Sequence, residues 1–194
     1  MIKIGLTGNI AAGKSEVEKI FKKLGFPTIS ADDIVHNLFE NNIEVKNKVV
    51  KAFGEFDILS NGKLDRKKLG KIVFSDMTKK KEIENIIHPV VVKEIFSFFD
   101  KNKDEKLVLV DIPLLFEGHF EYLVDKIILV YANDKIRFER IKKRNNLEDE
   151  YIEKIMKSQL NQDLKKEKSD IVIINENKSL EELEKEIKEI VKNI

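Results

Sequence analysis

The chain has 194 residues, the length of one domain or of one core with small inserted subdomains. Charged residues make up 37% of it and nearly cancel to a net charge of +1, which argues against a protein that binds nucleic acid through a basic excess. The absence of cysteine excludes disulfides and thiolate metal sites. Without a signal-peptide pattern or an apolar stretch of ~20 residues, we expect a cytoplasmic protein that needs no membrane, as a monomer or weak homo-oligomer.

Apolar runs and helical patterns alternate along the chain. The runs rich in Ile, Val and Leu, each predicted to be a strand, are Ile2–Leu6, Pro27–Ser30, Lys106–Ile112, Lys126–Tyr131 and Asp170–Ile174. The last three are almost continuously apolar, as in strands covered on both faces. We therefore expect an α/β fold: a mostly parallel five-stranded sheet between two layers of helices. Two stretches interrupt the alternation: a helical insertion at about 45–103, without a convincing strand, and a charged helical lid at about 133–168.

Two helices have clear boundary signals. The first follows Lys14 and is expected to end at Gly25, which suits the left-handed conformation of a C-cap. The last opens with a capping box, Ser179 and Glu182. Its apolar positions are Leu180, Leu183, Ile187, Ile190 and Ile194. This stripe is too short to favour a coiled coil, so we predict a helix that packs on the core.

The segment from Gly8 to Ser15 (GNIAAGKS) matches the pattern G-x-x-x-x-G-K-[ST] of a phosphate-binding loop, between a predicted strand and a predicted helix. In such a P-loop the main-chain N–H groups and the helix N-terminus attract phosphate. Lys14 would reach the β- and γ-phosphates, and Ser15 would supply a hydroxyl ligand to Mg²⁺. An ordinary glycine turn is the alternative. The predicted ATP-binding residues here are Gly8, Asn9, Ile10, Ala11, Ala12, Gly13, Lys14, Ser15 and Glu16. The fold expected is thus a three-layer sandwich of the P-loop NTPase type.

Two carboxylates follow the second predicted strand, Asp32 and Asp33. Ligands of open α/β sheets bind beyond the carboxyl ends of the strands. One of the pair could therefore accept a proton from an acceptor hydroxyl, or orient that hydroxyl. The alternative is that Asp32 or Asp33 only caps a helix starting near Ile34.

Only four of the 36 basic residues are arginines, and three of them, Arg137, Arg140 and Arg144, share one face of a predicted helix. The planar guanidinium binds phosphate oxygens in pairs, which lysine cannot do. The face could close over ATP and neutralise charge during transfer. A solvated basic face paired with Glu139 is the alternative.

Two weaker signals remain open. Pro89 disfavours a helical conformation at His88, so we expect His88 at a bend between helices, where a lone histidine is usually structural. Asp111 ends the third long strand and either holds Mg²⁺ through water or caps the turn at Pro113.

These residues, in order, resemble one family, the bacterial dephospho-CoA kinases. Its motifs are matched by GLTG before the P-loop turn, Ser30-Ala-Asp32, Phe53-Gly54, residues 62–66 (GKLDR), Val73-Phe74, residues 86–89 (IIHP), residues 111–117 (DIPLLFE), Arg140, Arg144, Gln159 and residues 169–175 (SDIVIIN). The resemblance covers nearly the whole chain.

The resemblance implies transfer of the γ-phosphoryl group of ATP, with Mg²⁺, to the 3′-hydroxyl of dephospho-CoA, completing coenzyme A. It implies Asp32 as the base, Lys14 and Arg140 as catalytic cations, and Arg144 and Asn175 on the ATP side. His88, Arg66 and the segment from Leu114 to Glu117 would lie near the acceptor.

The sequence departs from the family pattern at four positions. Asn9 and Ala11 stand where the family often has glycine, and Ala12 where it often has serine. Ser30 replaces an acid, which leaves it open whether Asp111 or Asp33 helps to hold Mg²⁺. The rival functions are a kinase for another small acceptor, such as a nucleoside monophosphate, and a nucleotide-sensing switch, which would need neither an acceptor-facing acid nor lid arginines.

Overall fold

The computed structural model describes residues 1–54, 58–60, 63–145 and 147–194. These form two compact units, one of residues 1–30 and 102–194, the other of residues 31–101. Each unit is described by itself. No described helix is long and apolar enough to cross a membrane.

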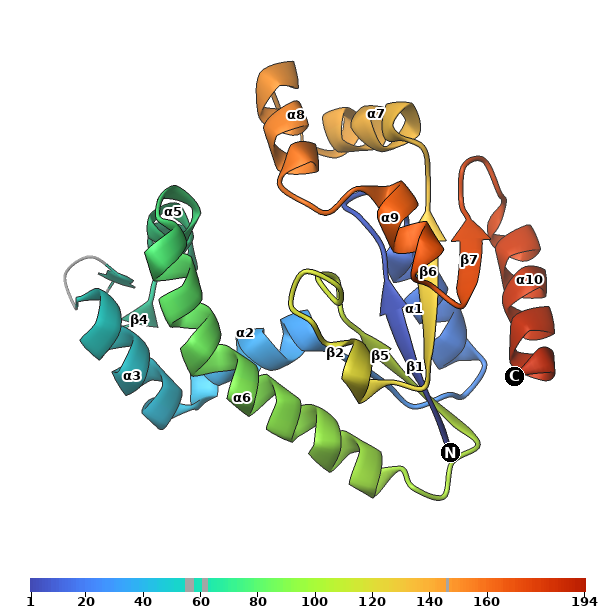
Figure 1. Ribbon diagram of the computed structural model, residues 1–194, viewed down its shortest axis with the longest axis horizontal. Coiled ribbons are helices and arrows are strands. Elements are labelled where there is room, and N and C mark those ends of the chain that lie inside the picture. The colour runs from blue at the N-terminus through green and yellow to red at the C-terminus, as the bar shows by residue number, and fades with distance from the viewer. Residues whose placement is uncertain (55–57, 61–62, 146) are drawn as a thin grey trace. The chain divides into compact units, whose positions relative to one another are not determined.

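A five-stranded parallel sheet forms the first unit, in the order β2-β5-β1-β6-β7 (Figure 1). Its strands are β1 (Ile2–Thr7), β2 (Thr28–Ser30), β5 (Leu107–Asp111), β6 (Lys126–Tyr131) and β7 (Ile171–Ile174). The five predicted strands are therefore confirmed, each to within a residue or two. Register places Leu6 of β1 beside Asp111 of β5, so the carboxyl ends of these strands meet at one edge.

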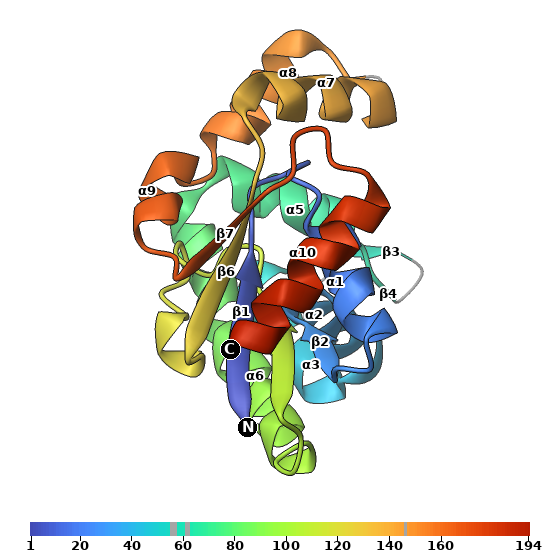
Figure 2. The same cartoon turned by 90° about the vertical axis from the view of Figure 1, so that its right-hand side faces the viewer.

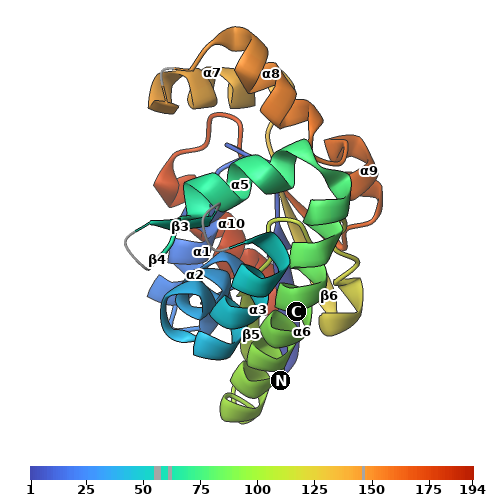
Figure 3. The same ribbon diagram turned by 90° about the vertical axis from the view of Figure 1, so that its left-hand side faces the viewer.

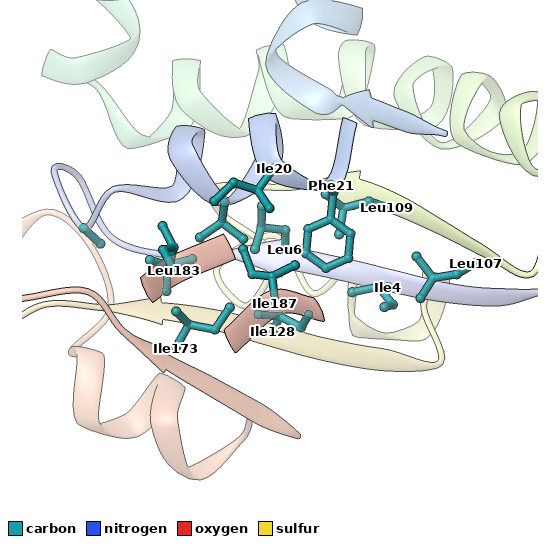
Figure 4. Packing of buried hydrophobic residues seen from close by; sticks show 13 residues of the cluster. Ile4, Leu6, Ile20, Phe21, Leu107, Leu109, Ile128, Ile173, Leu183 and Ile187 are labelled. Carbon is teal, nitrogen blue, oxygen red and sulfur yellow. The ribbon is translucent and has the colours of Figure 1, made fainter. Parts of the chain in front are cut away.

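Helices cover both faces of this sheet, as expected for a three-layer α/β fold. Figure 2 shows α1 (Lys14–Lys23) and α10 (Leu180–Asn193) together on one face, and α9 (Gln162–Glu167) on the other. Figure 4 shows the core between the sheet and the helix pair, where Leu6, Phe21 and Ile187 are fully buried. Burying each such side chain stabilises the fold by about 1.5–3 kcal/mol.

Both predicted helix boundaries are confirmed. Gly25 has φ 87° and its N–H donates to the carbonyl of Lys22, while the N–H of Phe26 donates to that of Phe21, a pattern that ends α1. Ser179 and Glu182 cap α10 reciprocally. The helix packs on the core as predicted, except that Leu180 is 62% exposed.

Three helices follow β6 within the predicted lid: α7 (Asp134–Asn145), α8 (Asp149–Lys157) and α9. Between β5 and β6 the chain forms turns and the short 3₁₀ helix η1 (Glu121–Leu123). Residues 159–161 link α8 to α9 and pass beside the P-loop turn.

The second unit is mostly helical (Figure 3). Its elements are α2 (Ala31–Asn41), α3 (Ile43–Phe53), β3 (Leu59–Ser60), β4 (Lys63–Leu64), α5 (Arg66–Ser75) and α6 (Met77–Lys101). Two expectations are wrong here. The region contains an antiparallel strand pair, β3-β4, and His88 lies inside the continuous helix α6 rather than at a bend. Gly62 of the family-like segment lies outside the described residues.

Candidate active site

The turn between β1 and α1 has the shape of a phosphate-binding loop. Glycine is required at two positions of this turn, for a different physical reason at each. A Cβ at Gly8 would lie 2.7 Å from the carbonyl oxygen of Val130 on β6. Gly13 has φ 96°, and a Cβ there would overlap the Asn175 amide. Ala11 also adopts a left-handed conformation, with φ 62°. Closing the turn, the N–H of Ala12 donates to the carbonyl of Asn9 at 3.0 Å.

Lys14, in the first turn of α1, pairs with Asp111 at the end of β5. Its Nζ lies 2.5 Å from both carboxylate oxygens, and the two side chains are 15% and 5% exposed. The pairing follows from the register of β1 and β5, which brings the P-loop beside the carboxyl end of β5. A partly buried ammonium and a buried carboxylate therefore lie side by side at the end of the P-loop turn.

The donors at this edge suit a divalent metal held jointly with phosphate. Ser15 offers a hydroxyl and Asp111 a carboxylate, both hard oxygen ligands. In the described part of the chain, no three His, Asp or Glu side chains gather as a metal cage of their own. Mg²⁺ is typically held by one or two carboxylates, substrate phosphates and water, so this sparse set fits it.

Arg140 of α7 joins the P-loop to the turn after β7. Its Nη1 donates to the carbonyls of Ala11 and Ala12 at 3.2 and 3.3 Å, and its Nη2 to those of Asn175 and Glu176 at 2.9 and 3.2 Å. The buried Asn175 amide adds a bond to the Ala12 carbonyl at 3.1 Å. The structure thus brings Arg140 and Asn175 together with the P-loop, while the roles toward ATP that the resemblance implies for them stay predictions.

The three arginines of α7 do not share one environment. Arg137 is only 2% exposed, and its Nε donates to the carbonyl of Ile10 at 3.1 Å. Burial lowers the pKa of its guanidinium, while the nearby Asp134 carboxylate, 3.2 Å away, acts in the opposite direction. Arg144, near the other end of α7, is exposed. The interpretation as a solvated basic face is wrong for Arg137.

The predicted acceptor-side residues fall mostly in the second unit. Asp32 and Asp33 lie in the first turn of α2, which begins at Ala31, so neither is the cap of a helix starting near Ile34. Arg66 starts α5 and its Nη1 lies 2.7 Å from Nδ1 of His36. Burial lowers the pKa of His88 in α6. Leu114 belongs to the first unit and is 44% exposed.

Sequence reasoning missed two buried polar side chains on α9. Lys165 of α9 is fully buried, and its Nζ lies 2.7 Å from Oε1 of Glu117, which the resemblance had placed near the acceptor. Gln162 is also buried and donates to the Ala132 carbonyl and to Asp134. No local sequence pattern predicts that these two residues are buried, because the sequence of α9 is that of a charged surface segment.

Comparisons with known proteins agree with this geometry. A family model for dephospho-CoA kinase matches residues 2–181. A dephospho-CoA kinase of Listeria monocytogenes serotype 4b is 40% identical over 198 residues, covering 98% of each chain. The crystal structure of TT1252 from Thermus thermophilus has a TM-score of 0.85 at 30% identity, over 100% of this chain and 97% of that one. Dephospho-CoA kinase from Campylobacter jejuni has a TM-score of 0.72 at 35% identity, over 98% of both chains. The chain belongs to the dephospho-CoA kinase family.

Proposed function

We propose that the protein transfers the γ-phosphoryl group of ATP to the ribose 3′-hydroxyl of dephospho-CoA, giving coenzyme A and ADP in the cytoplasm. The observation that carries the proposal is the meeting of Lys14, Asp111 and Arg140 around the P-loop, in a chain that belongs to this family. Main-chain amides, one ammonium and one guanidinium are the groups that phosphoryl transfer requires around the triphosphate.

On the ATP side, the cradle residues Gly8 to Glu16 surround the phosphates. Lys14 exchanges its contact with Asp111 for the β- and γ-phosphates when nucleotide binds, because a triphosphate offers it more negative charge than one carboxylate. Arg140 stabilises the negative charge that develops on the transferring phosphoryl group. Asn175 and Arg144 contact the ATP molecule. Mg²⁺, held by Ser15 and Asp111 with the phosphates, would neutralise charge on the β- and γ-oxygens.

On the acceptor side, Asp32 is proposed as the base. It follows the carboxyl end of β2 by two residues, at the sheet edge where ligands of such folds bind. The acceptor oxygen forms a bond to the γ-phosphorus, the bond from that phosphorus to the bridging oxygen of ADP breaks, and Asp32 takes the hydroxyl proton. Leu114, Arg66 and His88 are proposed to contact dephospho-CoA.

The direct test measures ADP formation from ATP and Mg²⁺, with and without dephospho-CoA. We expect turnover to depend on dephospho-CoA and the product to be phosphorylated at the 3′-position. Turnover with a nucleoside monophosphate instead would identify a different acceptor. Saturable ATP binding without turnover on any acceptor would indicate a nucleotide-sensing switch and contradict the proposal.

The role of Asp32 predicts that Asp32→Asn lowers kcat by about 10²–10⁴-fold, because the amide cannot accept the hydroxyl proton. ATP affinity, measured by calorimetry, should stay near that of the parent. Asp33→Asn is the matched control, one residue away in the same helical turn, and should retain most activity. If Asp33→Asn is instead the damaging change, the base is Asp33.

A further inference from the structure

We infer that Gln159 and Arg137 are positioning residues for the P-loop, an inference that rests on ATP as the proposed ligand. They fix the P-loop in its binding conformation by forming hydrogen bonds with both the N–H and the carbonyl of Ile10. The N–H of Ile10 donates to Oε1 of Gln159 at 2.8 Å. Its carbonyl accepts from Nε of Arg137 at 3.1 Å. The two peptide units that flank the Cα of Ile10 are thus held by two separate segments of the lid, α7 and the α8–α9 link.

A third bond joins the same parts. Nδ2 of Asn9, a residue only 4% exposed, donates to the carbonyl of Leu160 at 2.9 Å. The tip of the P-loop is therefore tied to the α8–α9 link through a side chain of each partner. The Gln159 side chain binds the main chain of Ile10, and the Asn9 side chain binds the main chain of Leu160, so each segment holds the other.

The turn needs such support because Ala11, next to Ile10, has φ 62°. For a residue with a Cβ, the left-handed conformation costs roughly 1–2 kcal/mol. Such a conformation persists only where surrounding contacts determine it. The bond from Arg137 to the Ile10 carbonyl holds the peptide that precedes Ala11, the bond from the Ile10 N–H to Gln159 holds the peptide before that, and Arg140 binds the carbonyl of Ala11 itself at 3.2 Å.

The lid side of this clamp is itself anchored. Leu160 donates its N–H to Oε1 of Glu117 at 3.0 Å, and that carboxylate pairs with the fully buried Lys165. Arg137 is braced by Asp134, whose carboxylate also accepts from the buried Gln162 at 2.9 Å. Gln159 and Arg137 thus act from fixed positions.

This arrangement gives the main chain of Ile10 a structural role in the P-loop. With its N–H on Gln159 and its carbonyl on Arg137, Ile10 shapes the turn, and phosphate binding is left to the amides that follow it. Loss of the clamp should therefore weaken ATP binding more than it slows the chemical step.

The test compares Gln159→Met, which keeps the length of the side chain but has no acceptor, with the parent in the full chain. We expect the dissociation constant for ATP with Mg²⁺ to rise about 5- to 50-fold, as for the loss of one hydrogen bond to an amide left unpaired. The kcat at saturating ATP and the KM for dephospho-CoA should change by less than about twofold. Lys157→Met, two residues earlier and exposed, is the control and should bind ATP like the parent.

A second variant separates positioning from general destabilisation. Glycine adopts φ > 0 without strain, so in an Ala11→Gly background the added effect of Gln159→Met on ATP affinity should shrink severalfold. If the parent binds ATP but Gln159→Met binds it equally well, or if the effect is undiminished in the Ala11→Gly background, the inference is overturned. A parent that binds no ATP would instead contradict the proposed function.

Discussion

At the scale of the residue, Arg140 is the cation whose shape matters most. Two of its nitrogens serve four main-chain carbonyls, two in the P-loop and two after β7. A guanidinium can span such a set because its donors are fixed in one plane, whereas an ammonium offers a single point of charge. Charge alone therefore does not account for the choice of arginine at this position.

The proposed role of Arg140 toward the transferring group predicts that Arg140→Lys lowers kcat by at least about 10²-fold, because the planar fork is lost. ATP should still bind through Lys14 and the turn amides, but more weakly than to the parent, because Arg140 also holds the Ala11 carbonyl. Measuring ADP formation at saturating substrates gives kcat, and titration calorimetry gives the affinity for ATP. Lys142→Arg, an exposed cation swap on the same helix, is the control. Parent-like kcat in Arg140→Lys would limit Arg140 to holding the turn.

The P-loop residues could be predicted because the glycines of the motif occur where the backbone allows no Cβ. Gly8 lies too close to β6 for a side chain, and Gly13 needs a positive φ. The different environments of Arg137 and Arg140 could not be predicted from the sequence. Helical spacing shows that the two residues share a face of the helix, but it does not show how deeply each side chain is buried. The partner of Lys165 lies in another element, and no spacing rule connects it to Glu117.

At the scale of the element, the position of α9 depends on that buried ion pair. Glu117→Gln keeps an acceptor for the Leu160 N–H but leaves the Lys165 charge without its partner. An uncompensated buried charge is strongly destabilising, so we expect a loss of about 3 kcal/mol in the free energy of unfolding, measured in urea. Glu153→Gln removes an exposed pair on α8 and should cost under about 1 kcal/mol.

The sign of the pH dependence gives a second check on this variant. Burial lowers the pKa of Lys165. Between that lowered pKa and the ordinary value of 10.5, the unfolded chain binds more protons than the folded one, so stability rises with pH in this window. The deficit of Glu117→Gln should therefore shrink at alkaline pH. A deficit that is constant with pH, or absent, would show that the charge of Lys165 is not what the carboxylate compensates.

Among the elements, long strands were the most predictable because both faces are buried and their apolar runs are unbroken. The pair β3-β4 was missed because each strand has only two residues. Pro89 was expected to break a helix, yet α6 continues because its buried positions Ile87, Val91, Ile95 and Phe99 repeat every four residues across it. Packing along that stripe outweighs the one hydrogen bond that proline removes.

At the scale of the whole molecule, the division into two units separates the proposed binding roles except for Leu114, an acceptor-side residue of the first unit. The contacts described above for Lys14, Arg140 and Asn175 join residues of the first unit, 1–30 and 102–194. Asp32, Arg66 and His88 belong to residues 31–101. The two substrates should therefore leave different signatures when each is added alone.

Hydrogen–deuterium exchange measures these signatures directly. ATP with Mg²⁺ should slow exchange in residues 8–16, α7 and residues 175–176, whereas dephospho-CoA alone should slow it in α2, α5 and α6. A ligand at 100 times its dissociation constant stabilises the bound state by about 2.7 kcal/mol, or roughly 100-fold in exchange by opening. Lys14→Ala should abolish the protection by ATP and leave that by dephospho-CoA. Protection of α5 and α6 by ATP alone would assign the second unit to the nucleotide, because the P-loop itself belongs to the first unit.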